Sequence, residues 1–413
     1  MSAPPVTPAS AASAASGAAE QLPRIRSALG RLVSYKQGRP VRSPEGHAFP
    51  LSANESPYEP IPAVVQAIHE AALGVNRYPD NSCADLISEI SARFAVPEET
   101  VAVGCGSVGV SQMLLEAVAE PGGEVLYAWR SFEAYPILTR LSGATPVEVP
   151  LKDGAHDLDA MAAAITDRTR LIFICNPNNP TGTVISRSDL EAFLDRVPAD
   201  CLVVIDEAYI EYVRHDDVPD GLTLRPGRPN VVVLRTFSKA YGLAGLRIGF
   251  VVGHPTVVEA LRKAFLPYSV NGVAQAAAIA ALRSEEALMA RVETTVEERE
   301  RVHHTLTEQG WRVTPSSANF LWLQLGDRTL AFAGHCAATG VAIRPFAGEG
   351  VRVSIGSPAE NDAFLAASAT FPTTPGHPGP GEGTHSQDHR AAGDEHTPQS
   401  RHLDRVPAEP GTS

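Results

Sequence analysis

The stretch "TFSKAYGLAGLRIGF" (236–250) places a serine and a lysine side by side, directly after a hydrophobic segment with the composition of a strand. A lysine in a partly apolar site has a lowered pKa, so Lys239 is expected to be a free amine that forms a Schiff base with an aldehyde. Ser238 and Arg247 are suited to hold a phosphate dianion, because a hydroxyl donates one hydrogen bond and a guanidinium donates several. The stretch therefore predicts an imine-forming lysine beside a phosphate site.

A second stretch, "VVIDEAYIEY" (203–212), places an acid at the end of a buried strand. A buried carboxylate is costly unless it meets a cation or a donor, and Asp206 is expected to meet a protonated ring nitrogen. Tyr209 is expected to donate a hydrogen bond to a phenolate oxygen. Glu207 is interpreted as an ordinary acid of a helix or turn.

Two further peptides follow predicted strands. In "VGCGSVGVSQMLLEA" (103–117), glycines permit a tight turn, and Ser107 and Val108 are expected to begin a helix. The free backbone N–H groups at the start of a helix attract phosphate, and a plain helix cap is the alternative. In "CNPNNPTGT" (175–183), asparagines and prolines form a rigid loop that would aim an amide at a ligand; an ordinary turn is the alternative.

Taken together, the four peptides meet the requirements of one cofactor. They supply an imine-forming lysine, an anionic partner for a ring N–H group, a phosphate cup, and amide and phenol donors. Pyridoxal 5'-phosphate is recognised by this combination. No metal site is expected, because the histidines of the C-terminal tail match no ligand template.

The elements that must position these residues alternate along the chain. Short apolar runs predict strands that begin near residues 101, 124, 171, 201, 231 and 248, and helices are expected at 107–119, 157–165 and 188–195. This rhythm predicts an α/β fold with a mainly parallel central sheet flanked by helices. Because ligands bind at the carboxyl ends of such strands, the four peptides are expected to meet at one edge.

From about residue 284 the pattern changes. A long amphipathic helix with Leu288, Val292 and Val296 on one stripe precedes the strands "NFLWLQL" and "VRVSIG" and the helix "AENDAFLAASATF", which predict a smaller α+β domain. The expected organisation is a disordered N-terminal extension (1–21), an N-terminal arm (22–50), a large cofactor-binding domain (51–265), a small domain (266–371) and a disordered tail (372–413).

Composition excludes several classes of protein. A formal net charge of −13 argues against a nucleic-acid partner, and no apolar run approaches the length that spans a membrane. The first residues are not expected to form a signal peptide. The five cysteines form no CxxC pair, which predicts reduced thiols in a cytoplasmic protein, with each cysteine expected to be a small core side chain.

The motifs "NPNNPTG", "DEAY" and "TFSKAYGLAGLRIG" resemble the signature of fold-type I aminotransferases, specifically the histidinol-phosphate aminotransferase subfamily. The resemblance extends over about residues 22–371 and includes "ANESPY", "NRYPDN" and "ANF". The peptides "GCGSVGVSQ" and "WRSFEAYPI" are most similar to a narrower actinobacterial group of aromatic amino acid (phenylalanine) aminotransferases.

The resemblance implies roles for cofactor contacts. Lys239 would hold the cofactor as an imine and later carry the proton between the substrate Cα and the cofactor. Asp206 would pair with the pyridine nitrogen, and Asn179 and Tyr209 would contact the phenolic oxygen. The residues implied to hold the phosphate are Ser107, Val108, Ser238 and Arg247.

Further residues are implied to bind the ring, the partner subunit's cofactor and the substrate. Phe132 would stack on the ring, and Arg352 would grip the α-carboxylate of the substrate. Tyr78 would reach the cofactor of a neighbouring subunit, which implies a homodimer. The residues implied to lie near the substrate side chain are Tyr58, Tyr268 and Arg344.

The expected activity is transfer of an amino group between aromatic amino acids (phenylalanine, tyrosine and tryptophan) and 2-oxoglutarate. Histidinol-phosphate aminotransfer in histidine biosynthesis is the alternative. A decarboxylase related to the same subfamily and a binding or regulatory protein with this fold are further alternatives. The latter usually carries a DNA-binding region, and none is evident in this sequence.

Overall fold

A computed structural model describes residues 23, 25–30, 32, 41–44 and 46–372, and these residues belong to one compact unit. The predicted disordered extension (1–21) and nearly all of the predicted tail (372–413) lie outside the described residues. In the described part, none of the helices combines the length and the apolar character needed to cross a bilayer.

The larger sheet has seven strands in the order β2-β8-β7-β6-β5-β3-β4. Strands β7, β6, β5, β3 and β4 run parallel to one another, whereas β8 is antiparallel to both β7 and β2. The strands are β2 (Val101–Gly104), β3 (Glu124–Trp129), β4 (Thr145–Pro150), β5 (Thr169–Cys175), β6 (Leu202–Asp206), β7 (Val231–Thr236) and β8 (Gly249–Val252). The predicted α/β fold with a mainly parallel sheet is confirmed.

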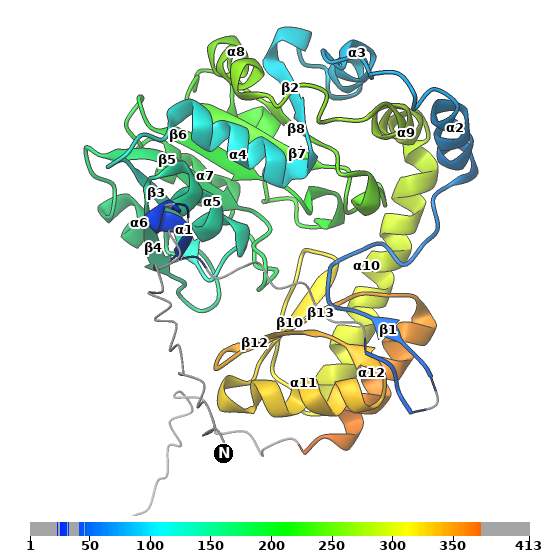
Figure 1. Ribbon diagram of the computed structural model, residues 1–413. Coiled ribbons are helices and arrows are strands. Elements are labelled where there is room, and N and C mark those ends of the chain that lie inside the picture. The colour runs from blue at the N-terminus through cyan, green and yellow to red at the C-terminus, as the bar shows by residue number, and fades with distance from the viewer. Residues whose placement is uncertain (1–22, 24, 31, 33–40, 45, 373–413) are drawn as a thin grey trace, which may run out of the picture. The chain divides into compact units, whose positions relative to one another are not determined.

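Helices cover both faces of this sheet. Along β6, Val204 packs in the apolar cluster under α4, α5 and α8, whereas Val203 and Ile205 pack in the cluster under α6 and α7, as the period of two in a strand requires. Figure 1 shows α4 lying across the sheet beside β7 and β8. The helices are α4 (Gly106–Val118), α5 (Ala134–Ser142), α6 (Leu158–Ala163), α7 (Arg187–Leu194) and α8 (Pro255–Ala264).

Further helices pack beside the β2–β8 end of the sheet. Helices α2 and α3 both contact α9, and their buried side chains join those of β2 and β8 in one cluster. These helices are α2 (Pro62–Ala72), α3 (Ala84–Phe94) and α9 (Gly272–Arg283), and the short α1 (Ser27–Gly30) precedes them in the chain.

The C-terminal part has a separate antiparallel sheet of order β12-β13-β10-β9. Its core contains Leu321 and Leu323 of β10, Val351 and Val353 of β13, and residues of the surrounding helices. The elements are α10 (Glu285–Glu308), β9 (Val313–Thr314), β10 (Phe320–Gln324), α11 (Thr329–Ala338), β12 (Arg344–Phe346), β13 (Gly350–Ser354) and α12 (Pro358–Thr370). Strand β1 (Phe49–Pro50) pairs with β11 (Val341–Ala342) and ties the N-terminal arm to this part.

The cysteines only partly follow the expectation from sequence. Cys83, Cys175, Cys201 and Cys336 are buried free thiols, which fits small core side chains. Cys105 is exposed, because it occupies the N-cap position of α4, where the chain leaves β2. Its interpretation as a core side chain is wrong.

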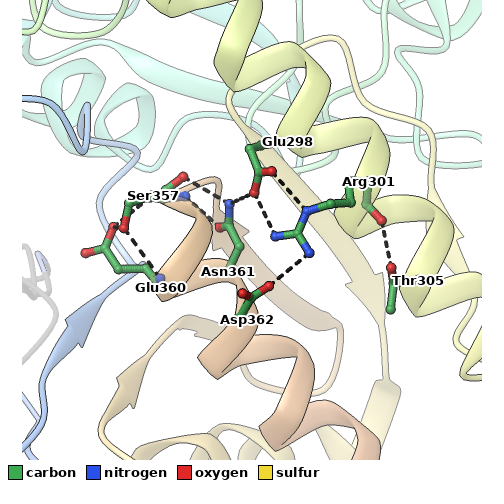
Figure 2. A network of polar contacts seen from close by, with 8 residues as sticks. Glu298, Arg301, Thr305, Ser357, Glu360, Asn361 and Asp362 are labelled. Carbon is green, nitrogen blue, oxygen red and sulfur yellow. Dashed lines mark hydrogen bonds and ion pairs between the residues drawn. The ribbon is translucent and has the colours of Figure 1, made fainter.

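A polar network fixes the start of α12 on α10 (Figure 2). The amide of Asn361, which is 1% exposed, exchanges hydrogen bonds of 2.8 and 3.0 Å with the backbone of Gly356 and donates one of 2.8 Å to Glu298. Arg301 donates to Glu298 at 2.8 Å and pairs with Asp362 at 2.9 Å. Because β13 ends just before α12, this network also sets where β13 lies.

We expect Asn361→Ala to lower the free energy of unfolding by about 2 kcal/mol, because it leaves the buried N–H and C=O groups of Gly356 without their side-chain partner and removes one of the hydrogen bonds to Glu298. Urea unfolding followed by circular dichroism measures the effect. Asp362→Asn is the matched control: it alters the same network at a side chain that is 64% exposed, and we expect a loss below about 0.5 kcal/mol. Equal losses in both variants would contradict this assignment.

Candidate active site

Three neighbouring parallel strands bring the predicted residues to one edge of the larger sheet. Asp206 ends β6, and its register partner Cys175 ends β5. Asn179 follows β5, and Lys239 follows β7, which pairs with β6. The carboxyl edge of an α/β sheet is where such folds bind ligands.

Asp206 is a buried acid, 3% exposed, with a hydrogen bond at each carboxylate oxygen. It accepts from the hydroxyl of Tyr135 at 2.7 Å and from the backbone N–H of Ala208 at 3.2 Å. Burial raises the pKa of Asp206 to about 6, and these two bonds oppose the rise. A carboxylate can accept about four hydrogen bonds, so Asp206 keeps lone pairs for a further donor.

The amine of Lys239 donates to the carbonyl oxygens of Ala53 and Asn54, at 3.2 and 3.1 Å. Burial, together with the positive charges of Arg352 and Arg247, lowers its pKa to about 7. A large share of the amine is therefore unprotonated near neutral pH, which is the form that reacts with an aldehyde.

Tyr209 and Asn54 form a second part of the site. The hydroxyl of Tyr209 accepts from the amide of Asn54 at 3.0 Å, and Lys239 Nζ lies 5.9 Å from the centre of the Tyr209 ring. Burial raises the pKa of Tyr209, so its hydroxyl stays protonated. Asn54 was not predicted as a site residue, although it lies in the peptide "ANESPY"; its contacts come from segments distant in the chain.

The predicted phosphate cup is compact. Arg247 donates to the hydroxyl of Ser238 at 3.2 Å. A Cβ added at Gly106, whose φ is +72°, would overlap the Arg247 guanidinium, and one added at Gly249 would lie 2.6 Å from Ser107 N. The guanidinium and the first N–H groups of α4 thus lie close together only because these positions are glycines.

Arg352 lies on β13 of the smaller sheet, and its side chain contacts the loop after β5 at the edge of the larger sheet. It is 8% exposed, and it donates to Asn179 Oδ1 and to the carbonyl of Ser52, both at 2.6 Å. Its guanidinium also lies 5.6 Å from the centre of the Phe320 ring. The loop after β5 is fixed by other asparagines: Asn178, for example, accepts from Ser131 at 2.8 Å and donates to Thr181 at 2.8 Å.

Phe132 packs near Asp206 through another ring. Its ring meets Tyr135 edge to face, with centroids 5.6 Å apart. Tyr135 stacks on Phe173 at 4.2 Å and donates to Asp206. Tyr135 was not predicted as a site residue; a tyrosine in "FEAY" was the available signal.

The remaining predicted residues have partners of their own. Tyr78, 82% exposed, stacks on Tyr268 with centroids 4.6 Å apart. Arg291 lies over the Tyr58 ring at 5.6 Å, and Arg344 pairs with Glu133 at 2.8 Å. Within the described part of the chain, no hydrogen bond or ring contact joins the tyrosines 58, 78 and 268 to Lys239 or Asp206.

The interpretation of Glu207 as a helix or turn acid is wrong. Glu207 is 1% exposed and accepts from Arg235 at 2.7 and 3.0 Å and from the backbone N–H of Gly221 at 2.6 Å. Its partner Arg235 lies on β7, far along the chain. The buried pair is structural, and it joins β6 to β7 next to the site.

Comparisons with known proteins agree with this geometry. The family model described as aminotransferase class I and II matches residues 47–367. The aromatic amino acid aminotransferase of Thermobifida fusca is 59% identical over 350 residues, which cover 85% of this chain and 98% of the relative. That of Streptomyces coelicolor is 57% identical over 353 residues, with coverages of 85% and 98%.

A solved aminotransferase structure also resembles this chain. Histidinol-phosphate aminotransferase from Sinorhizobium meliloti, in complex with pyridoxal-5'-phosphate, superposes with a TM-score of 0.77 at 28% identity and covers 85% of this chain and 98% of its own. The resemblance drawn from the motifs is thus confirmed: the chain belongs to the class I and II aminotransferases.

Proposed function

We propose that this chain is a pyridoxal-phosphate-dependent aminotransferase that exchanges the amino group of aromatic amino acids with 2-oxoglutarate. The observation that carries the proposal is the Lys239 amine, with a pKa lowered to about 7, at the same sheet edge as the buried carboxylate of Asp206. The substrate class rests on relatives named aromatic amino acid aminotransferases at 59% and 57% identity.

The residues present fit pyridoxal phosphate. Asp206 keeps lone pairs for a pyridinium N–H group, and Arg247, Ser238 and the start of α4 supply donors for a phosphate dianion. We assign the same roles to Ser107 and Val108 through their backbone. Asn179 and the protonated Tyr209 would donate to the phenolic oxygen, and Phe132 would cover the ring.

When bound, the cofactor would supply a conjugated ring that stabilises negative charge at the substrate Cα. Lys239 would accept the Cα proton on Nζ, which its lowered pKa permits near pH 7. The ionised Asp206 would hold a positive charge on the ring nitrogen. Arg352 would orient the substrate through its α-carboxylate, since a guanidinium binds a carboxylate with two parallel hydrogen bonds.

Other parts of the proposal concern the surroundings of the site. We propose a cytoplasmic homodimer in which Tyr78 reaches the partner's cofactor; Tyr78 and its neighbour Leu73 are 82% and 87% exposed in the single chain. Tyr58, Tyr268 and Arg344 would lie near the substrate side chain. A large domain (51–265) and a small domain (266–371) would enclose the substrate.

Lys239→Ala should abolish covalent attachment of the cofactor and lower turnover by roughly a thousandfold or more, because the chain loses both the imine-forming amine and the proton carrier. Borohydride reduction followed by mass spectrometry measures the attachment, and phenylalanine turnover measures the activity. Lys263→Ala is the matched control, since Lys263 is 74% exposed and pairs with Glu259. Substantial activity in Lys239→Ala would overturn the assignment.

Tyr135→Phe should move the pH dependence of cofactor binding. The Tyr135 hydroxyl lowers the pKa of Asp206, so its removal raises that pKa above about 6. Asp206 then becomes protonated at a higher pH, and the loss of cofactor affinity on acidification should begin about one pH unit higher.

Measuring the dissociation constant of pyridoxal phosphate at a series of pH values gives this shift, and a displacement of roughly one pH unit is resolvable. Tyr127→Phe is the control, because Tyr127 is equally buried but its hydroxyl bonds to Glu148 at 3.1 Å. An identical midpoint in both variants would show that Tyr135 does not act on Asp206.

An amino-acceptor panel decides the substrate class. With glutamate as donor, we expect phenylpyruvate to be converted with a kcat/KM at least about tenfold above that of imidazole-acetol phosphate, because relatives at 59% and 57% identity carry the aromatic name. The structural neighbour from Sinorhizobium meliloti carries the other name at 28% identity. Conversion of the phosphate ester alone would establish the histidinol-phosphate reaction in its place.

A further inference from the structure

A buried chain of hydrogen bonds runs from the smaller sheet to Tyr209. The hydroxyl of Ser354, the last residue of β13, accepts from the backbone N–H of Asn54 at 2.8 Å and donates to Asn54 Oδ1 at 3.0 Å. The amide nitrogen of Asn54 then donates to the hydroxyl oxygen of Tyr209 at 3.0 Å. All three residues are at most 3% exposed, so bulk water has little access to these bonds.

The single proton of Ser354 determines which end of the Asn54 amide faces Tyr209. Because the Ser354 oxygen accepts a backbone N–H group, its own proton is donated to Oδ1, and the NH2 end of the amide is turned toward Tyr209. With the amide turned over, Tyr209 could donate to Oδ1. The Ser354 proton would then lose the acceptor that it has in the described part of the chain, which costs free energy at a buried position.

This direction of the chain leaves the Tyr209 proton for a ligand. The Tyr209 oxygen accepts from Asn54, and among the hydrogen bonds between described residues none uses the Tyr209 proton. Burial raises the pKa of the Tyr209 hydroxyl, so the proton stays on the oxygen. Lys239 Nζ lies 5.9 Å from the centre of the Tyr209 ring. An acceptor oxygen on a ligand beside Lys239 would therefore complete the chain.

We propose that Asn54 is a positioning residue: its amide, held by Ser354, makes Tyr209 a donor toward the bound cofactor. A tyrosine hydroxyl can accept or donate, and without a fixed neighbour both directions are open to it. With the Asn54 NH2 group on its oxygen, Tyr209 keeps its proton for the opposite side. This inference rests on the proposed function, and it deepens that function by explaining why Tyr209 would donate to the phenolic oxygen.

The test reverses the bond between Asn54 and Tyr209 in the cofactor-loaded protein. In Asn54→Asp the new carboxyl group has the shape of the amide but no N–H group, so Tyr209 would donate to it and withdraw its proton from the cofactor. A donor at the phenolic oxygen favours the ionised form of that oxygen and lowers the pKa of the bound cofactor. We therefore expect the midpoint of the pH-dependent visible absorbance to rise by about one pH unit.

Tyr209→Phe supplies the matched background, because it lacks the donor that Asn54 is proposed to orient. This variant should itself have a raised midpoint, and adding Asn54→Asp to it should move the midpoint by less than about 0.3 pH unit. A new negative charge that acted directly on the cofactor would instead raise the midpoint equally in both backgrounds. Spectrophotometric titration gives the midpoints, and thermal unfolding verifies that each variant is folded.

Ser354→Ala tests the other end of the chain without introducing a charge, and it decides the matter if Asn54→Asp does not fold. Without the Ser354 proton the amide can present either end to Tyr209. We expect the midpoint to rise by about half a pH unit, and to stay unchanged when Ser354→Ala is added to Tyr209→Phe. An unchanged midpoint in the folded variants, or equal rises in both backgrounds, would overturn the role of Asn54.

These outcomes are separate from the fate of the proposed function. If the unaltered protein binds pyridoxal phosphate through Lys239 and turns over phenylalanine, midpoints that do not respond to Asn54 and Ser354 refute the positioning role alone. If pyridoxal phosphate added to the unaltered protein gives no pH-dependent absorbance of a Lys239-bound cofactor, the proposed function fails, and this inference fails with it.

Discussion

One buried asparagine holds the parts of the site in register. Asn54 is 1% exposed and has a φ of +55°, a conformation that a short polar side chain tolerates better than most. Its carbonyl accepts from Lys239 and Asn319, its amide donates to Tyr209, and its backbone N–H donates to Ser354. Lys239 and Tyr209 follow strands of the larger sheet, whereas Asn319 directly precedes β10 and Ser354 ends β13 of the smaller sheet, so segments next to both sheets meet at this residue.

The burial that positions the site also sets its charges. Burial raises the pKa of Asp206 to about 6 and lowers that of Lys239 to about 7, so both groups change charge close to neutral pH. Tyr135 and the backbone of Ala208 limit the first shift, and the nearby arginines deepen the second. Asp206 is ionised above its pKa, and Lys239 is largely neutral above its own. The burial, charges and hydrogen bonds that set these two pKa values therefore determine the pH range in which an ionised acid and a neutral amine coexist.

Local patterns in the sequence were sufficient to predict the strands next to the site, because β5, β6 and β7 are largely apolar runs buried on both faces. The same patterns did not predict β4, "TPVEVP", because it is largely exposed at the edge of the sheet and contains two prolines. The antiparallel direction of β8 and the pairing of Glu207 with Arg235 depend on contacts between distant segments. Motifs therefore led to the predictions for Lys239 and Asp206, but not to Asn54 and Tyr135, which contact them in the structure.

Buried and partly exposed polar contacts differ in the free energy of unfolding that their loss costs. The groups proposed to act on the reacting atoms sit in a buried hydrogen-bond network, where loss of one partner leaves another unsatisfied and costs stability. The Glu133–Arg344 and Arg130–Glu349 pairs are partly exposed, and such pairs contribute only about 0–1 kcal/mol each. Substitutions at these partly exposed pairs are therefore expected to leave the protein folded. The motifs thus make the expected chemistry visible in the sequence, whereas a pair such as Arg344 with Glu133 joins residues 211 positions apart, and only the three-dimensional structure brings them together.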